Sequence, residues 1–245
     1  MFGFFRSKKR EAHAYVPLTV DLHSHLIPGI DDGAKTMAES LRLLKGLESL
    51  GYTKCITTPH VMYDAYANTK ASILEGVEGL QKAAVEEGLK IEIKAGAEYY
   101  VDEGLSLLIA KDELLLIGGK YLLFETSYSH RPQQLEEIIF QIQSAGYTPM
   151  LAHPERYRYI DDPQEEYGAL KALGVEFQVN LNSLNGHYGK RAEKNARFLS
   201  QAGWIDFLGS DTHNEGHLKN LELVLSSKVY SEVYTKNKIK NSLFG

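Results

Sequence analysis

The sequence has few of the features that mark extracellular and membrane proteins. Its 245 residues include one cysteine, Cys55, so the chain cannot form an internal disulfide, and a zinc site made of several thiolates is excluded. It also lacks a run of about 20 apolar residues, which a membrane-spanning helix would need. We therefore expect a protein of the reducing cytoplasm without stable membrane insertion.

An excess of positive charge is absent as well. The chain carries 27 lysines and arginines against 32 aspartates and glutamates, a formal net charge of -5. Proteins that bind nucleic acid neutralise its phosphates with clustered basic residues, so we do not expect a nucleic-acid partner. A small phosphorylated group remains compatible with this composition, because it needs only a locally positive site.

Several motifs for phosphate chemistry are missing. A thiol phosphatase would need an arginine six residues after its cysteine, but Val61 stands at that distance from Cys55. The sequence contains no Asp-x-Asp pair, no Walker loop and no Gly-x-Gly-x-x-Gly after a strand. Mechanisms through a cysteinyl or aspartyl phosphate are therefore unsupported.

Short apolar runs alternate with amphipathic segments along the chain. Helical patterns follow capping boxes that begin at Thr36 and Ser72, follow Pro132, and run over Lys190–Ala202. The strand candidates between them are Leu18–Leu22, Lys54–Thr58, Ile91–Ala95, Tyr121–Phe124, Thr148–Ala152, Val175–Leu181 and Ile205–Gly209. Such alternation predicts an α/β fold with a parallel sheet, closed or nearly closed into a (β/α)7 barrel. We assign the barrel to residues 17–227, an N-terminal tail to 1–16, and a C-terminal tail or helix to 228–245.

Histidines and carboxylates follow the predicted strands. Because barrel enzymes build their active sites at the carboxyl ends of the strands, these side chains should converge. Together, the five histidines and four carboxylates exceed the needs of one ion and suit two or three divalent ions. Nitrogen and oxygen ligands without sulfur point to manganese, iron or zinc. The candidate metal ligands are His23, His25, Asp32, His60, Glu98, Glu125, His153, Asp211 and His213.

One arginine is a candidate for binding phosphate. Arg156 lies three residues after His153 on a loop at the mouth of the predicted barrel, and the alternative is an exposed ion pair with Glu155. Lys219 and Arg158 are candidates for a second basic residue. Tyrosines predicted on loops at the same end are candidates to flank an aromatic substrate ring: Tyr63, Tyr66, Tyr128, Tyr157 and Tyr159.

The motifs that carry these residues resemble the polymerase-and-histidinol-phosphatase (PHP) superfamily. The most specific stretch is Asp-Leu-His-Ser-His-Leu-Ile-Pro-Gly-Ile-Asp-Asp-Gly, from Asp21 to Gly33. Ala152-His-Pro-Glu-Arg156 and Gly209-Ser-Asp-Thr-His213 follow further along the chain. Within the superfamily, the sequence is most similar to the bacterial CpsB/CapC tyrosine phosphatases. Many other members carry histidines where Asp32 and Glu125 stand here.

The resemblance implies a distorted seven-stranded, TIM-like barrel with three metal ions. One ion would be held by His23, His25, Glu98 and Asp211. Glu98 would bridge to a second ion, held also by Glu125 and His153, and the third would be held by Asp32, His60 and His213. Manganese is the usual activator of the family, and related members carry zinc or iron.

The resemblance also implies an activity. A metal-bridging hydroxide would attack the phosphorus of phosphotyrosine, with Arg156 and Asp211 as the catalytic residues and Arg156 binding the phosphate. The partner would be a phosphotyrosine protein, a bacterial tyrosine kinase that regulates capsule or exopolysaccharide assembly.

Three alternatives remain at this point. The first is a small-molecule phosphatase of the histidinol-phosphate type, which Asp32 and Glu125 disfavour. The second is an amidohydrolase, whose metals are typically bridged by a modified lysine rather than by a residue such as Glu98. The third is a non-catalytic metal-stabilised module that docks a kinase, although a purely structural site would have a simpler, closed ligand set.

Overall fold

The computed structural model describes residues 18–245. The segment predicted as an N-terminal tail, 1–16, therefore lies outside the described residues. Among the described residues, no helix combines the length and the apolar composition needed to cross a membrane.

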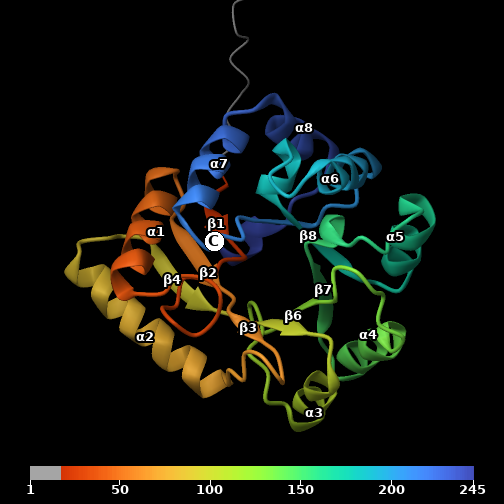
Figure 1. The fold of residues 1–245 in the computed structure, drawn as a ribbon, viewed down its shortest axis with the longest axis horizontal. Coiled ribbons are helices and arrows are strands. Elements are labelled where there is room, and N and C mark those ends of the chain that lie inside the picture. Colours follow the sequence, from red (N-terminus) through yellow and green to blue (C-terminus); the bar gives the residue numbers. More distant parts are fainter. Residues whose placement is uncertain (1–17) are drawn as a thin grey trace, which may run out of the picture.

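Strands in the described chain form two parallel sheets that follow one curved surface (Figure 1). The first sheet has the order β1–β2–β4, and the second has the order β3–β5–β6–β7–β8–β9. The first sheet consists of β1 (Val20–Asp21), β2 (Lys54–Thr57) and β4 (Glu92–Ala95). The second consists of β3 (His60–Val61), β5 (Glu98–Tyr100), β6 (Tyr121–Glu125), β7 (Thr148–Ala152), β8 (Glu176–Asn180) and β9 (Phe207–Gly209).

Two of the predicted strands are interrupted. Two residues separate β2 from β3, and two others separate β4 from β5, so in each case the chain continues and pairs again in the second sheet. The extra strands β3 and β5 were not predicted as separate elements. If β2 with β3 and β4 with β5 are each counted as one interrupted strand, residues 18–245 contain seven strands, as predicted.

The chain that follows β9 lies beside the chain that follows β1. Ser24 and Thr212 form a parallel bridge, in which the His25 amide donates to the Thr212 carbonyl at 3.0 Å. The Asp211 amide donates to the His23 carbonyl at 2.8 Å. These bonds join the chain after β9 to the chain after β1, so the predicted distorted α/β barrel is confirmed.

Helices cover the outside of the barrel (Figure 1). They are α1 (Met37–Ser49), α2 (Lys70–Glu86), α3 (Glu103–Lys111), α4 (Leu135–Ser144), α5 (Pro163–Ala172), α6 (Lys190–Ala202), α7 (Glu215–Leu225) and α8 (Lys228–Lys236). Thr36 caps α1 as predicted, and α6 has the predicted bounds. The second capping box was misplaced by three residues, because Thr69 is the cap of α2 and Ser72 is its partner.

The inside of the barrel is apolar toward its amino-terminal end. Side chains from the strands and from residues next to them form a small cluster there: Val20, Leu22, Ile56, Ile117, Tyr121, Leu123, Met150, Ala152 and Phe207. The short 3-10 helix η3 (Asn241–Phe244) closes this end, where the Phe244 ring lies 5.6 Å from Tyr121 and 6.0 Å from Phe207. The opposite end, at the carboxyl ends of the strands, is left for polar side chains.

Candidate metal centre

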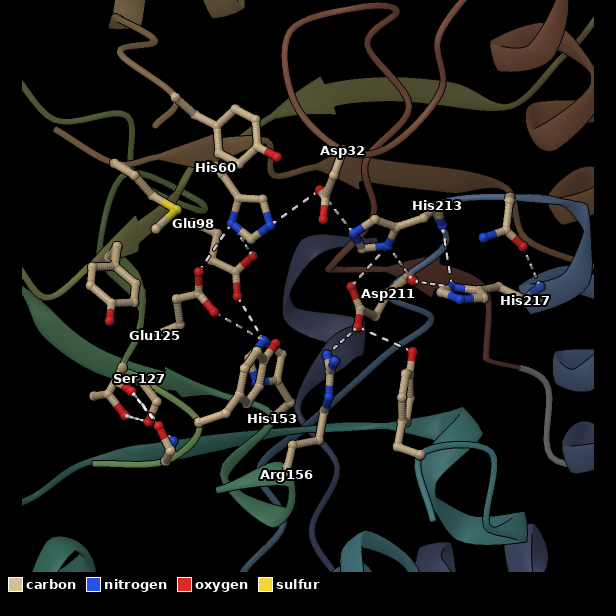
Figure 2. Close-up of a pocket in the computed structure, with 18 residues that line it drawn as sticks. Asp32, His60, Glu98, Glu125, Ser127, His153, Arg156, Asp211, His213 and His217 are labelled. Atoms are coloured by element: carbon tan, nitrogen blue, oxygen red, sulfur yellow. Dashed lines mark hydrogen bonds and ion pairs between the residues drawn. The ribbon is translucent and has the colours of Figure 1, made fainter. Parts of the chain in front are cut away.

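A cavity of about 670 Å³ opens at the carboxyl ends of the strands (Figure 2). Its floor and walls bring together side chains from distant parts of the sequence, as the convergence of parallel strands requires. Seven of the nine predicted metal ligands line it: Asp32, His60, Glu98, Glu125, His153, Asp211 and His213. The other two, His23 and His25, are completely buried beneath the floor.

The first group of candidate ligands gathers around two buried histidines. His23 Nε2 lies 3.2 Å from both His25 Nε2 and Glu98 Oε2, and 3.6 Å from Asp211 Oδ1. His25 Nε2 lies 3.5 Å from the same two carboxylate oxygens. Four atoms bound tetrahedrally at about 2.1 Å from one ion would be about 3.4 Å apart. The distances from the two histidine nitrogens to each other and to the carboxylate oxygens therefore suit ligands of a divalent ion, and these four residues are the first set implied by the resemblance.

The second group shares Glu98 with the first. While Glu98 Oε2 faces the first group, Glu98 Oε1 lies 2.9 Å from His153 Nε2. Glu125 Oε2 lies 3.8 Å from the same nitrogen. The two oxygens of Glu98 thus point toward neighbouring groups, as a bridging carboxylate would.

His60 lies between the second and third groups. His60 Nδ1 is 3.2 Å from Glu98 Oε2 and 3.1 Å from Glu125 Oε1, yet it is buried and has no hydrogen-bond partner among the described residues. On the other side of the ring, Nε2 lies 3.4 Å from Asp32 Oδ1, which is 3.3 Å from His213 Nε2. A buried nitrogen close to two carboxylates without a hydrogen bond fits a cation between them. The resemblance implied His60 only for the third set.

Neighbouring polar groups orient the two histidines below the floor. His23 Nδ1 lies 2.7 Å from Gln178 Oε1, and His25 Nδ1 lies 2.8 Å from Asp31 Oδ2. In metal sites such contacts fix the tautomer and leave the other ring nitrogen free for the ion. A Cβ on Gly33 would lie 2.2 Å from the His25 carbonyl oxygen, so only glycine lets this loop pack so closely. The sequence analysis gave no such role to Gln178 or Asp31.

The electrostatics of the site favour bound positive charge. Burial tends to raise the pKa of Glu98, but His23 and His60 hold it well below its usual range. Burial tends to lower the pKa of the histidines. Even so, Glu98 and Asp211 raise the pKa of His23 to about 10, and Glu98 together with Asp32 and Glu125 raises that of His60 to about 12. The carboxylates thus draw positive charge to this site, and divalent cations bound there would neutralise them.

Arg156 points into the cavity from the short 3-10 helix η1 (Pro154–Arg156), which follows β7 (Figure 2). Its Nη1 donates to Asp211 Oδ2 at 2.9 Å, and its guanidinium lies 4.6 Å from the Tyr128 ring centre and 4.2 Å from that of Tyr188. The alternative ion pair with Glu155 is wrong. Glu155 is buried and instead accepts hydrogen bonds from Ser183 Oγ at 2.6 Å and the Asn180 amide at 3.1 Å.

The candidates for a second basic residue do not reach the cavity. Lys219 and Arg158 are both exposed, and neither lines it, so Arg156 is the one lysine or arginine on its described walls. His217 also lines the cavity, although the sequence analysis did not single it out. Its Nδ1 lies 2.8 Å from the Asp211 carbonyl oxygen.

Tyrosines form part of the cavity wall. Of those singled out from the sequence, Tyr66 and Tyr128 line it, whereas Tyr157 is fully buried and donates to the Ala152 carbonyl. Tyr100 and Tyr188 also line the cavity, although the sequence analysis did not single them out. Tyr188 lies in the loop before α6, and only the path of that loop brings it over Arg156.

A parallel barrel with overlapping groups of histidines and carboxylates at the carboxyl ends of its strands defines a metal-dependent barrel hydrolase. Comparison with known proteins identifies the family. The model for capsular polysaccharide synthesis proteins CpsB/CapC matches residues 19–242, so the chain belongs to this family.

Two similar proteins illustrate the relationship. Tyrosine-protein phosphatase YwqE of Bacillus subtilis is 32% identical over 196 residues, covering 80% of this chain and 77% of YwqE. Tyrosine-protein phosphatase CpsB of Streptococcus agalactiae is 27% identical over 201 residues, covering 80% of this chain and 83% of CpsB.

A solved structure agrees with the sequence relationship. A chain from the crystal structures of YwqE of Bacillus subtilis and CpsB of Streptococcus pneumoniae, described as metal-dependent tyrosine phosphatases, superposes with a TM-score of 0.78. It is 28% identical, and the match covers 90% of this chain and 96% of that one. The chain is therefore a metal-dependent enzyme of the tyrosine-protein phosphatase class.

Proposed function

We propose that this enzyme hydrolyses phosphotyrosine in a protein substrate, using divalent ions held by the nine candidate ligands. The observation that carries the proposal is the arrangement of the cavity. Overlapping groups of histidines and carboxylates form one side, and Arg156, held between Tyr128 and Tyr188, faces them from another. A phosphate monoester bound there would contact both.

The proposed division of the ligands follows the resemblance. His23, His25, Glu98 and Asp211 would hold one ion, Glu98 with Glu125 and His153 a second, and Asp32, His60 and His213 a third. His25 also lies close to the third set, and His60 lies close to Glu98 and Glu125. Divalent ions bound there would supply a water of lowered pKa as the hydroxide nucleophile and positive charge for the phosphate oxygens. We propose manganese, with iron and zinc as the alternatives that these nitrogen and oxygen ligands also suit.

The chain's own residues position the substrate. Arg156 presents a planar fork of donors to the phosphate, and its aromatic neighbours keep the guanidinium in place. Tyr66, Tyr100 and Tyr128 form aromatic walls suited to the ring of the substrate. A tyrosinate leaves with a pKa of about 10, so its departure demands less protonation than that of an alkoxide.

The family suggests which protein is the substrate. Because the matching model describes capsular polysaccharide synthesis proteins, we propose that the substrate is a bacterial tyrosine kinase that regulates capsule or exopolysaccharide assembly. The negative net charge of the chain and the single arginine of the cavity give no support to a nucleic-acid substrate.

Substrate comparison tests the proposal. With manganese present, the rates of phosphate release from a phosphotyrosine peptide, a phosphoserine peptide and histidinol phosphate are measured at equal concentrations. We expect kcat/KM for the phosphotyrosine peptide to exceed the other two by at least about tenfold. A higher value for histidinol phosphate would instead establish the small-molecule alternative.

A further inference from the structure

A second cavity, about 270 Å³ in volume, lies beside the catalytic one, between the loop after β3 and helix α3. Figure 1 shows α3 next to the chain that follows β3. Most side chains that line this cavity are apolar. We call it the apolar groove and define it by Met62, Tyr63, Ala67, Tyr100, Leu107 and Leu108.

The groove exposes apolar surface to water. Tyr63 is 67% exposed and Leu107 is 56% exposed, although both belong to the large hydrophobic side chains that usually gain from burial. Exposed apolar residues that stand alone are common on proteins, but these two line the same cavity with Met62 and Leu108. A gathered patch of this kind next to a functional site is typical of a binding surface.

The walls of the groove are held in place by Asp102. Its Oδ1 accepts hydrogen bonds from the Gly104 and Leu105 amides at 2.9 and 3.2 Å and so caps α3. Its Oδ2 accepts from the Tyr63 amide at 2.8 Å. One carboxylate thus ties the loop after β3 to the start of α3, and the groove is formed before any ligand arrives.

The groove is continuous with the catalytic cavity. Met62 and Tyr100 line both. At the far side of the groove stands Lys111, which forms no ion pair with any residue in the range 18–245. A polypeptide that places its phosphotyrosine in the catalytic cavity would pass these shared walls. An acidic side chain of that polypeptide would be complementary in charge to Lys111.

We propose that the apolar groove binds an apolar side chain of the phosphotyrosine polypeptide and so sets which tyrosines the enzyme dephosphorylates. This specificity site rests on the proposed function. Because Met62 and Tyr100 line both cavities and an extended chain advances about 3.3–3.6 Å per residue, we expect the apolar side chain within about three residues of the phosphotyrosine.

Peptide kinetics test the groove. A set of alanine-based phosphotyrosine peptides carries one leucine at each position from three residues before to three residues after the phosphotyrosine. We expect leucine at one position to lower KM roughly tenfold relative to the all-alanine peptide, equivalent to about 1.4 kcal/mol, with little change in kcat. The Leu107→Asp variant should bring this leucine-to-alanine ratio close to one.

A control variant and a measurement of oligomeric mass complete the test of the groove. Leu223 lies on α7, is 66% exposed and does not line the groove, so Leu223→Asp should keep the wild-type ratio. A ratio near one at every position in the wild type would overturn the proposal, as would an unchanged ratio in Leu107→Asp. Light scattering separates a rival occupant: if Leu107→Asp changes the oligomeric mass but not the ratio, the groove binds a second copy and the proposal is wrong.

The same assay separates this proposal from the proposed function. If the wild type releases phosphate from none of the peptides and not from p-nitrophenyl phosphate, the phosphatase function itself fails. Release from all peptides at equal kcat/KM would leave that function standing and reject only the groove.

Discussion

Arg156 is the basic side chain of the cavity that is placed to bind a phosphate. It lies between two tyrosine rings, donates to Asp211 and is the one lysine or arginine on the described walls of the cavity. A phosphate that binds here would therefore depend on this guanidinium for its contact with a protein cation. Lysine at the same position would lose both the planar fork and much of the stacking on the rings.

Replacement of Arg156 should reduce catalysis without removing the metal ions. We expect Arg156→Ala to lower kcat/KM for a phosphotyrosine peptide by about 10² to 10³, the effect of deleting one preorganised donor to a developing charge. Arg156→Lys should recover only part of the loss. Steady-state kinetics are compared with metal content from mass spectrometry, and a kcat/KM for Arg156→Ala within threefold of the wild type would contradict the role.

Glu155 should make the stability of the protein depend on pH. Burial raises the pKa of its carboxyl to about 7, above the ordinary value of 4.5. The folded state therefore binds the proton more tightly than the unfolded state. The stabilising effect is complete below about pH 4.5 and is lost as the pH rises through about 7, with a total on the order of 3 kcal/mol.

The Glu155→Gln variant tests this titration, because glutamine cannot ionise. Urea unfolding of both proteins at equal metal content is measured between pH 5 and pH 8. We expect the free energy of unfolding to fall by about 3 kcal/mol more in the wild type than in the variant over this range. Equal slopes in the two proteins would show that Glu155 does not titrate near neutral pH.

The residues of the site differ in how far the sequence predicts them. The nine candidate ligands could be found because histidines and carboxylates directly after apolar strands have few structural explanations, and parallel strands deliver their ends to one place. Gln178 and Asn180 could not be found in this way. They lie on β8, their side chains are neutral, and only the register beside β9 brings them toward His23 and Asp211.

At the scale of elements, apolar runs predicted strands better than they predicted breaks. All seven strand candidates overlap strands of the structure, but the division of β2 from β3 and of β4 from β5 was not predicted. The breaks fall where the chain transfers from one sheet to the other, which depends on pairing between distant segments.

Helices α3, α5 and α7 were also missed. Only two residues of α3 and two of α5 are buried, so their apolar stripes are short.

The element η3 holds the amino-terminal end of the barrel together. Asn241 donates through Nδ2 to the Val20 carbonyl at 3.0 Å and the Leu208 carbonyl at 2.8 Å. Its Oδ1 accepts from the Leu208 amide at 3.0 Å. One buried side chain thus joins β1 to β9 where no strand pairing between them is present in the described sheets.

Loss of Asn241 should therefore destabilise the fold. Asn241→Ala leaves three buried backbone groups without partners, and we expect the free energy of unfolding to fall by about 3 kcal/mol. The neighbouring exposed Ser242→Ala serves as the control and should change it by less than about 0.5 kcal/mol. Urea unfolding measures both, and a change of similar size in the two variants would refute the bridging role of Asn241.

In the whole molecule, the apolar side chains inside the barrel and the ionisable side chains of the cavity lie at opposite ends of the barrel. The amino-terminal end is filled by apolar side chains and closed by η3, whereas the carboxyl end gathers ionisable groups around a cavity. Buried carboxylates and histidines are costly unless they are paired or bind ions. The fold supports such a cluster because the apolar end and the surrounding helices supply the stabilising burial.

The most direct test of the account combines removal of metal with removal of ligands. Chelator-stripped protein is assayed on a phosphotyrosine peptide with and without added manganese, beside the double variant Asp211→Ala, His213→Ala. We predict that phosphate release requires manganese and that the double variant shows none above background while keeping the wild-type circular dichroism spectrum. Release by stripped protein at the full rate, or full activity in the double variant, would contradict a metal-dependent reaction at this site.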